Sequence, residues 1–162
     1  RAGTENVSHI VALAKACELA AAAQSDEQQV RALRDRLQAA LSARIPHIQV
    51  NGEGAPRLPN TLNVACHYIE GEGILYQLSE YGICASSGSA CTSGSLDPSH
   101  VLKAMHVPFT AMHGSVRFSL SRYTTDAEVD SVIEVFPGIV SSLRRMSPYW
   151  DNANNRPRPD AP

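Results

Sequence analysis

The chain has 162 residues, a hydrophobic content of 43% and a formal net charge of −2. This length suffices for one domain with a buried core, and the composition is typical of a soluble globular protein. The near-neutral charge gives no electrostatic reason to expect binding to nucleic acid or to a membrane surface. No apolar run approaches the roughly 20 residues of a membrane span. Four cysteines without a Cys-x-x-Cys pair exclude a disulfide scaffold and a structural zinc site, which favours a reducing cytoplasm.

Helical periodicity marks the first two segments. Residues 5–24 form a predicted alanine-rich helix, and we expect it to pack tightly through one face. That face carries Val7, Ile10, Val11, Ala14, Cys17 and Ala21. A second helix is predicted from Ser25 to Pro46, with Gln28 at the capping-box spacing from Ser25. Its buried stripe is predicted to comprise Val30, Leu33, Leu37, Ala40 and Leu41.

The middle of the chain favours short strands. Strands are predicted at 48–50, 61–66 and 83–85, with a short helix from Ile74 to Tyr81 between the last two. The third strand leads into a run of small residues at 86–95.

The C-terminal third continues the alternation. We predict a helix from Asp97, its cap, to Met105, and an alternating strand over 115–120. A last helix begins at Thr125 with Glu128 completing a capping box, and Pro137 should kink or break it. Residues 148–162 are rich in Pro, Asn and Asp and are predicted to be disordered. This order predicts an α/β protein of the α+β kind, with helices packed on a small mixed or antiparallel sheet.

Cys91 is the leading candidate for a reactive group. It lies among small residues, bracketed by Gly88 and Gly94, whereas a free cysteine usually sits among apolar neighbours. The loop suits a thiolate nucleophile or sulfur carrier that must move, although an incidental surface cysteine would look the same. The other three, Cys17, Cys66 and Cys84, are interpreted as core residues.

Arg117 is the second candidate. It alternates with the apolar residues of its strand, so its guanidinium suits bidentate binding of a carboxylate, or else it merely faces solvent. His113 stands just before this strand and is interpreted as structural or exposed, and the other histidines show no metal spacing.

Several runs resemble the NifS/IscS-type cysteine desulfurases of the class-V aminotransferase family. The loop run is Gly82-Ile83-Cys84-Ala85-Ser86-Ser87-Gly88-Ser89-Ala90-Cys91-Thr92-Ser93, and the helix after it also fits. The strand run is Gly114-Ser115-Val116-Arg117-Phe118-Ser119-Leu120-Ser121-Arg122-Tyr123-Thr124-Thr125. Further matches are Arg1-Ala2-Gly3-Thr4-Glu5-Asn6 and Arg57-Leu58-Pro59-Asn60-Thr61-Leu62-Asn63-Val64. The nitrogen-fixation NifS branch looks nearer than the housekeeping branch.

The resemblance implies the C-terminal part of a homodimeric pyridoxal 5'-phosphate enzyme of fold type I. Residues 1–24 would end the large domain, and 25–147 would form the small domain with the cysteine loop at 85–95. Cys91 would take sulfur from L-cysteine as a persulfide, Arg117 would bind the substrate carboxylate, and Thr4 would contact the cofactor phosphate. The sulfur would pass to an iron–sulfur scaffold of the NifU/IscU type. Cys91 would also be the one metal candidate, sharing a transient [2Fe-2S] cluster with that scaffold.

The chain departs from the family pattern in its lysines. Lys15 and Lys103 are its only lysines, and neither has the context of the Schiff-base lysine, which we therefore expect outside this chain. The chain also begins with Arg1 rather than Met, so we expect a fragment or a processed product. His106 stands where the family usually has glycine. Two hypotheses remain: a piece of an enzyme, or an isolated chain that only accepts sulfur or binds the scaffold.

Overall fold

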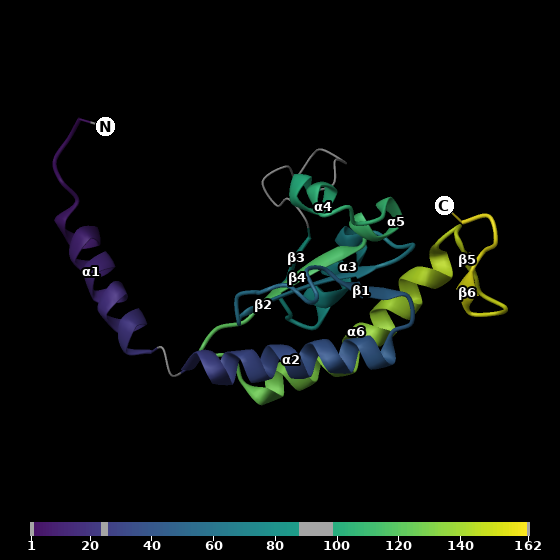
Figure 1. Ribbon diagram of the computed structural model, residues 1–162, viewed down its shortest axis with the longest axis horizontal. Coiled ribbons are helices and arrows are strands. Elements are labelled where there is room, and N and C mark those ends of the chain that lie inside the picture. Colours follow the sequence, from purple (N-terminus) through teal and green to yellow (C-terminus); the bar gives the residue numbers. More distant parts are fainter. Residues whose placement is uncertain (1, 24–25, 88–98, 162) are drawn as a thin grey trace.

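The computed structural model describes residues 2–23, 26–87 and 99–161 (Figure 1). The helices are α1 (Val7–Ala22), α2 (Asp26–Arg44), α3 (Gly71–Glu80), α4 (His100–Ala104), α5 (Phe109–Met112) and α6 (Asp126–Met146). The strands are β1 (Ile48–Val50), β2 (Thr61–Cys66), β3 (Ser86–Ser87), β4 (Ser115–Ser119), β5 (Trp150–Asp151) and β6 (Arg156–Pro157).

A four-stranded antiparallel sheet of order β1-β2-β4-β3 organises the chain, as the predicted α+β class requires. Leu62 lies opposite Phe118, and Val64 lies opposite Val116, in the central pair of strands. Because side chains alternate along a strand, these four residues share one face of the sheet. That face therefore carries the apolar core.

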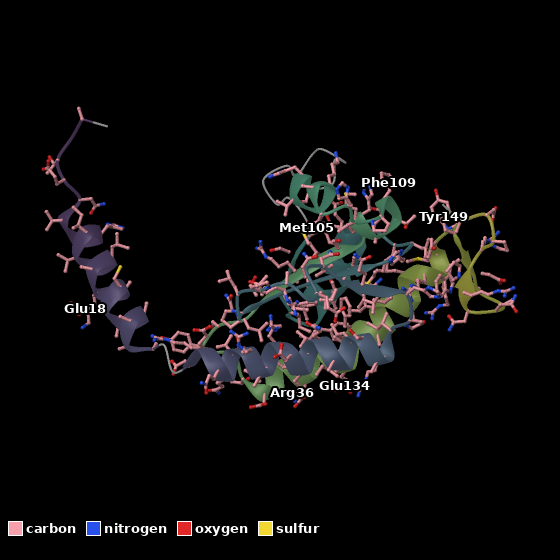
Figure 2. All side chains as sticks on the ribbon, in the orientation of Figure 1. Glu18, Arg36, Met105, Phe109, Glu134 and Tyr149 are labelled. Atoms are coloured by element: carbon pink, nitrogen blue, oxygen red, sulfur yellow. The ribbon has the colours of Figure 1, made fainter. Side chains whose placement is uncertain are left out.

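The two faces of the sheet are covered differently. Helices α2, α3 and α6 bury the apolar face, and the largest fully buried side chains there include Phe136, Leu37, Leu41, Ile74 and Leu78. Helices α4 and α5 lie on the other side, where a small cluster comprises Ala65, Leu102, Val107 and Ala111. Figure 2 shows Met105 and Phe109 on the opposite side of the sheet from Arg36 and Glu134. The second face is thus only partly covered and remains largely polar.

The predicted packing of the first helix is wrong. Helix α1 forms over Val7–Ala22, capped by the side chain of Asn6, but it buries none of its residues. Its apolar side chains stay open, Leu13 being 66% exposed, and Cys17 is exposed rather than core. Figures 1 and 2 show this helix standing clear of the other elements. The amphipathic pattern predicts which face of a helix is apolar, but none of the described residues packs against this face of α1.

Two boundaries near the cysteine run also differ from prediction. Ile83 and Ala85 pack against the core without strand pairing, and the strand begins at Ser86 instead. Cys84 between them is exposed rather than buried in a strand. Gly82, with φ of +70°, ends the turn that follows α3. The next three residues connect this turn to β3 at the edge of the sheet. Ser99 caps α4 by accepting from the Val101 N–H, whereas Asp97 and Ser25, the predicted caps, lie outside the described residues.

Helix α6 keeps its predicted cap but not its predicted break. Thr125 and Glu128 form a reciprocal capping box, and backbone and side-chain hydrogen bonds from Thr125 lower the pKa of Glu128. The helix continues through Pro137. Proline lacks the N–H that would bond the carbonyl of Ile133, and Arg44 Nη1 donates to that oxygen at 3.0 Å instead. The side chain of a neighbouring helix thus replaces the missing hydrogen bond.

The C-terminal segment is ordered, so the prediction of a disordered 148–162 is wrong for the described residues up to 161. Strands β5 and β6 pair, and Trp150 is 2% exposed. The guanidinium of Arg144 lies 4.6 Å from the centre of the Trp150 ring and donates to the carbonyls of Pro46 and His47. One buried aromatic ring anchors the segment through this cation–π contact, which a polar composition does not reveal.

Glycine at 114 is a steric requirement that mutation can test. A Cβ built on Gly114 would lie 1.9 Å from the carbonyl oxygen of Cys66, whereas one on Gly138, inside α6, would meet nothing within 4 Å. We expect Gly114→Ala to lower the free energy of unfolding by roughly 1–3 kcal/mol or to prevent folding. Gly138→Ala, the matched control, should raise it by about 0.5–1 kcal/mol. Urea unfolding of both variants measures the difference, and equal stabilities would contradict the close approach.

Candidate functional site

A row of polar side chains crosses the open face of the sheet. Asn63 lies opposite Arg117, and Arg117 lies opposite Ser86. The row extends to Asn51, whose N–H donates to the carbonyl of Asn63 at 2.9 Å just beyond β1. We call Asn51, Asn63, Arg117 and Ser86 the transverse row. Its members come from four separate parts of the sequence, and only strand pairing brings them together.

Arg117 has a guanidinium available to an anion. The side chain is exposed, and its Nη2 donates a long hydrogen bond of 3.5 Å to Ser86 Oγ. Within the described ranges no carboxylate lies within 4.0 Å of it, although five other cation–carboxylate contacts involving Lys or Arg form there. A guanidinium on a rigid strand, without an acidic partner in the described ranges, suits a carboxylate ligand.

The other end of the row is held by a buried network. Asn51 is buried, and its Nδ2 donates to Asn63 Oδ1 at 2.6 Å and to Ser115 Oγ at 3.4 Å. Ser115 Oγ donates in turn to the carbonyl of Ala111 at 3.1 Å. The oxygen of Asn51 accepts from Gln49 Nε2 at 3.2 Å. The sequence analysis missed Asn51 and Asn63, because strand alternation gives their face but not their partners.

The strand that pairs with Arg117 leads into the predicted nucleophile loop. Cys91 lies in residues 88–98, outside the described residues. Ser87, the last described residue before that segment, lies opposite Val116, next to Arg117. Helix α4 begins directly after the segment, and its Leu102 packs over the same open face. The described residues on either side of the segment thus belong to elements that contact this sheet, β3 at its edge and α4 over the open face.

Two other candidates stand apart from Arg117. Thr4 is exposed in the non-helical segment ahead of α1. Figure 1 shows this segment away from the sheet. His113 Nδ1 lies 3.8 Å from Glu70 Oε2, and its ring meets Phe109 edge-on at 4.5 Å. These contacts fit the structural interpretation of His113. In the described part of the chain, no group of three His, Cys, Asp or Glu side chains is placed to hold a metal ion.

The thiols of the described cysteines differ in environment. Burial raises the pKa of the Cys66 thiol to about 12, with the charge of Arg144 opposing the shift. Cys66 is fully buried, as predicted, whereas Cys17 and Cys84 are exposed. Cys66 is therefore an inert core thiol.

No described helix is long and apolar enough to cross a membrane.

Comparison with known proteins places this architecture in a class. The aminotransferase class-V family model matches residues 1–132. A NifS-like protein from Rickettsia africae superposes with a TM-score of 0.75 at 28% identity, over 86% of this chain and 36% of the other. A second NifS-like protein also gives 0.75, at 33% identity, over 88% of this chain and 36% of the other. The chain therefore belongs to the class-V aminotransferase family.

Its relatives within that family are cysteine desulfurases. The cysteine desulfurase of Gluconacetobacter diazotrophicus is 60% identical over 94% of this chain. Cysteine desulfurase NifS of Azotobacter vinelandii is 58% identical over 93%. The match covers 38% of the length of each of these relatives. The resemblance drawn from the motifs is thus confirmed.

Thiol alkylation tests the contrast between the cysteines. At pH 8 we expect iodoacetamide to modify Cys17 and Cys84 within minutes, while Cys66 remains unmodified because its thiol is buried and protonated. Peptide mass spectrometry resolves the three sites. Addition of urea to unfold the chain should expose Cys66 and equalise the rates. Rapid modification of Cys66 in the folded chain would contradict its burial.

Proposed function

We propose that this chain is the C-terminal part of a cysteine desulfurase, which removes sulfur from L-cysteine and leaves L-alanine. One observation supports this most directly: Arg117 has no carboxylate partner among the described residues and pairs with Ser86, which leads to Cys91. The proposed carboxylate-binding residue is thus paired with the strand that precedes the candidate nucleophile in the sequence. The high identity to cysteine desulfurases agrees with this chemistry.

In the proposed reaction Cys91 is the nucleophile. Its thiolate attacks the sulfur of L-cysteine, so a sulfur–sulfur bond forms and the carbon–sulfur bond of the substrate breaks. The electron pair of the broken bond passes to the substrate carbon, which takes a proton to give L-alanine. The enzyme keeps the sulfur as a persulfide on Cys91. Arg117 holds the substrate carboxylate so that the sulfur faces the loop.

The family implies pyridoxal 5'-phosphate, which acts as an electron sink for the substrate carbons when bound. Neither lysine of this chain has the setting of a Schiff-base residue. Lys15 pairs with Glu18 at 2.9 Å on exposed α1, and Lys103 is exposed on α4. We therefore propose that the Schiff-base lysine lies in the portion of the relatives' length that this chain does not span. The exposed hydroxyl of Thr4 would serve the cofactor phosphate, across a homodimer interface.

The proposal includes a sulfur acceptor. We propose that the persulfide passes to an iron–sulfur scaffold of the NifU/IscU type in the cytoplasm, and that Cys91 ligates the scaffold's [2Fe-2S] cluster transiently. The nitrogen-fixation branch is favoured because a relative named NifS is 58% identical. The alternative is that the 162-residue chain, acting alone, only accepts sulfur or binds the scaffold, which the absence of a suitably placed lysine supports.

Activity of two samples separates these functions. The full-length parent should form L-alanine from L-cysteine, and Cys91→Ser should abolish persulfide and alanine formation, because serine cannot accept sulfur. Amino-acid analysis and persulfide labelling measure both products. The isolated chain should form none, yet should become labelled at Cys91 when given a persulfide donor. Full turnover by the Cys91→Ser parent would contradict the nucleophile assignment.

The role of Arg117 has its own test in the parent enzyme. Arg117→Ala should raise KM for L-cysteine by about 30-fold or more, because a charged bidentate contact is lost. Arg122→Ala, also exposed and five residues away, is the matched control and should leave KM within about twofold. Steady-state kinetics measure the change, and unchanged cysteine affinity in Arg117→Ala would return Arg117 to a solvent-facing role.

A further inference from the structure

We propose that Asn63 is a second carboxylate-binding residue, donating a hydrogen bond from Nδ2 beside the guanidinium of Arg117. This inference rests on the proposed function, since it assigns a residue to the binding of the same substrate. Asn51 is the positioning residue that turns the Asn63 amide. Neither residue was a candidate in the sequence analysis.

Strand register places Asn63 beside Arg117. The two residues are directly opposite each other in the β2–β4 pair, where Cβ atoms of facing residues stand about 4.5–5.5 Å apart. Both belong to the open face, because Leu62, Val64, Val116 and Phe118 fill the core on the other. A small anion that reaches the guanidinium from this face therefore also reaches the amide.

A directional chain of hydrogen bonds determines which end of the amide is free. It begins at the backbone carbonyl of Ala111, which can only accept, so Ser115 donates to it. The Ser115 oxygen then accepts from Asn51 Nδ2, which also donates to Asn63 Oδ1 at 2.6 Å. With its oxygen turned toward Asn51, the Asn63 amide turns its nitrogen away from β1. Nδ2 has no hydrogen-bond partner among the residues that the structure describes.

The resulting site is made of donors. Arg117 offers guanidinium N–H groups and Asn63 offers an amide N–H, while Ser86 Oγ, an acceptor on the row, makes only a 3.5 Å contact with Arg117. The amide oxygen of Asn63, which would repel a carboxylate, is occupied by Asn51. Two adjacent strands thus present donors to one anion, and the row selects a substrate with a carboxylate.

Exchange of the amide for a carboxylate tests the inference in the full-length parent. Asn63→Asp keeps the shape but replaces the donor with a negative charge that would pair with Arg117. We expect KM for L-cysteine to rise about tenfold or more with kcat within about threefold, since a charge-assisted hydrogen bond is lost. Asn60→Asp, on the residue just before β2 and off the transverse row, is the matched control and should behave like the wild type.

Binding without turnover gives the second readout. We expect calorimetry to show that Asn63→Asp weakens the binding of L-alanine about tenfold or more. The affinity for cysteamine, which lacks a carboxylate, should be unchanged. An equal loss of affinity for both ligands, or no loss of affinity for L-alanine, would overturn the inference. If Asn63→Asp fails to fold, Asn63→Ser takes its place and should show the same selective loss.

The two proposals fail separately. A wild-type parent that forms no alanine from L-cysteine defeats the proposed function, while the comparison of L-alanine with cysteamine still tests Asn63. An active parent whose KM responds to Arg117→Ala but not to Asn63→Asp overturns only the inference.

Discussion

The pairing of β2 with β4 is the constraint on which the rest of the structure depends. Since side chains alternate along both strands, a slip of one residue would turn Val116 and Phe118 out of the core and Arg117 into it. The close approach of Gly114 to the carbonyl of Cys66 pins that register at the end of the pair, where the Cys66 N–H also bonds the Gly114 carbonyl at 2.9 Å. A side chain at 114 would force the strands apart at this point.

The same register joins the buried network to the open site. Asn51 and Ser115 are buried polar residues whose hydrogen bonds must be satisfied on the partly covered face. They satisfy each other and the carbonyl of Ala111, and in doing so they fix the amide of Asn63 beside Arg117. Folding therefore arranges the donors before any ligand arrives, and a preorganised site loses less entropy on binding.

Sequence patterns predicted most elements, because periodicity and caps are local. Thr125 and Glu128 form the expected capping box, and the positive φ of His106 (56°) fits the expectation of a position that favours glycine. The predictions that failed were those that depend on tertiary contacts. Arg44 lets α6 continue through Pro137, Arg144 and Trp150 order the tail, and no described residue covers α1. Arg117 was identified from alternation alone, but its neighbours Asn63 and Ser86 required the pairing of strands distant in sequence.

The arrangement also divides the proposed chemistry between parts of a larger protein. The sheet brings together Arg117 and Asn63, which we propose bind a carboxylate, whereas α1 and the segment ahead of it lie away from the sheet. The chain spans 38% of the length of these relatives, and we propose that the portion it does not span supplies the pocket for the cofactor. The proposed binding of a carboxylate by Arg117 depends on strand pairing, which sets Asn63 and Ser86 opposite it. In this proposal one L-cysteine molecule is held by both parts of the larger protein. The cofactor would bind its amino group, and the sheet of this chain would bind its carboxylate.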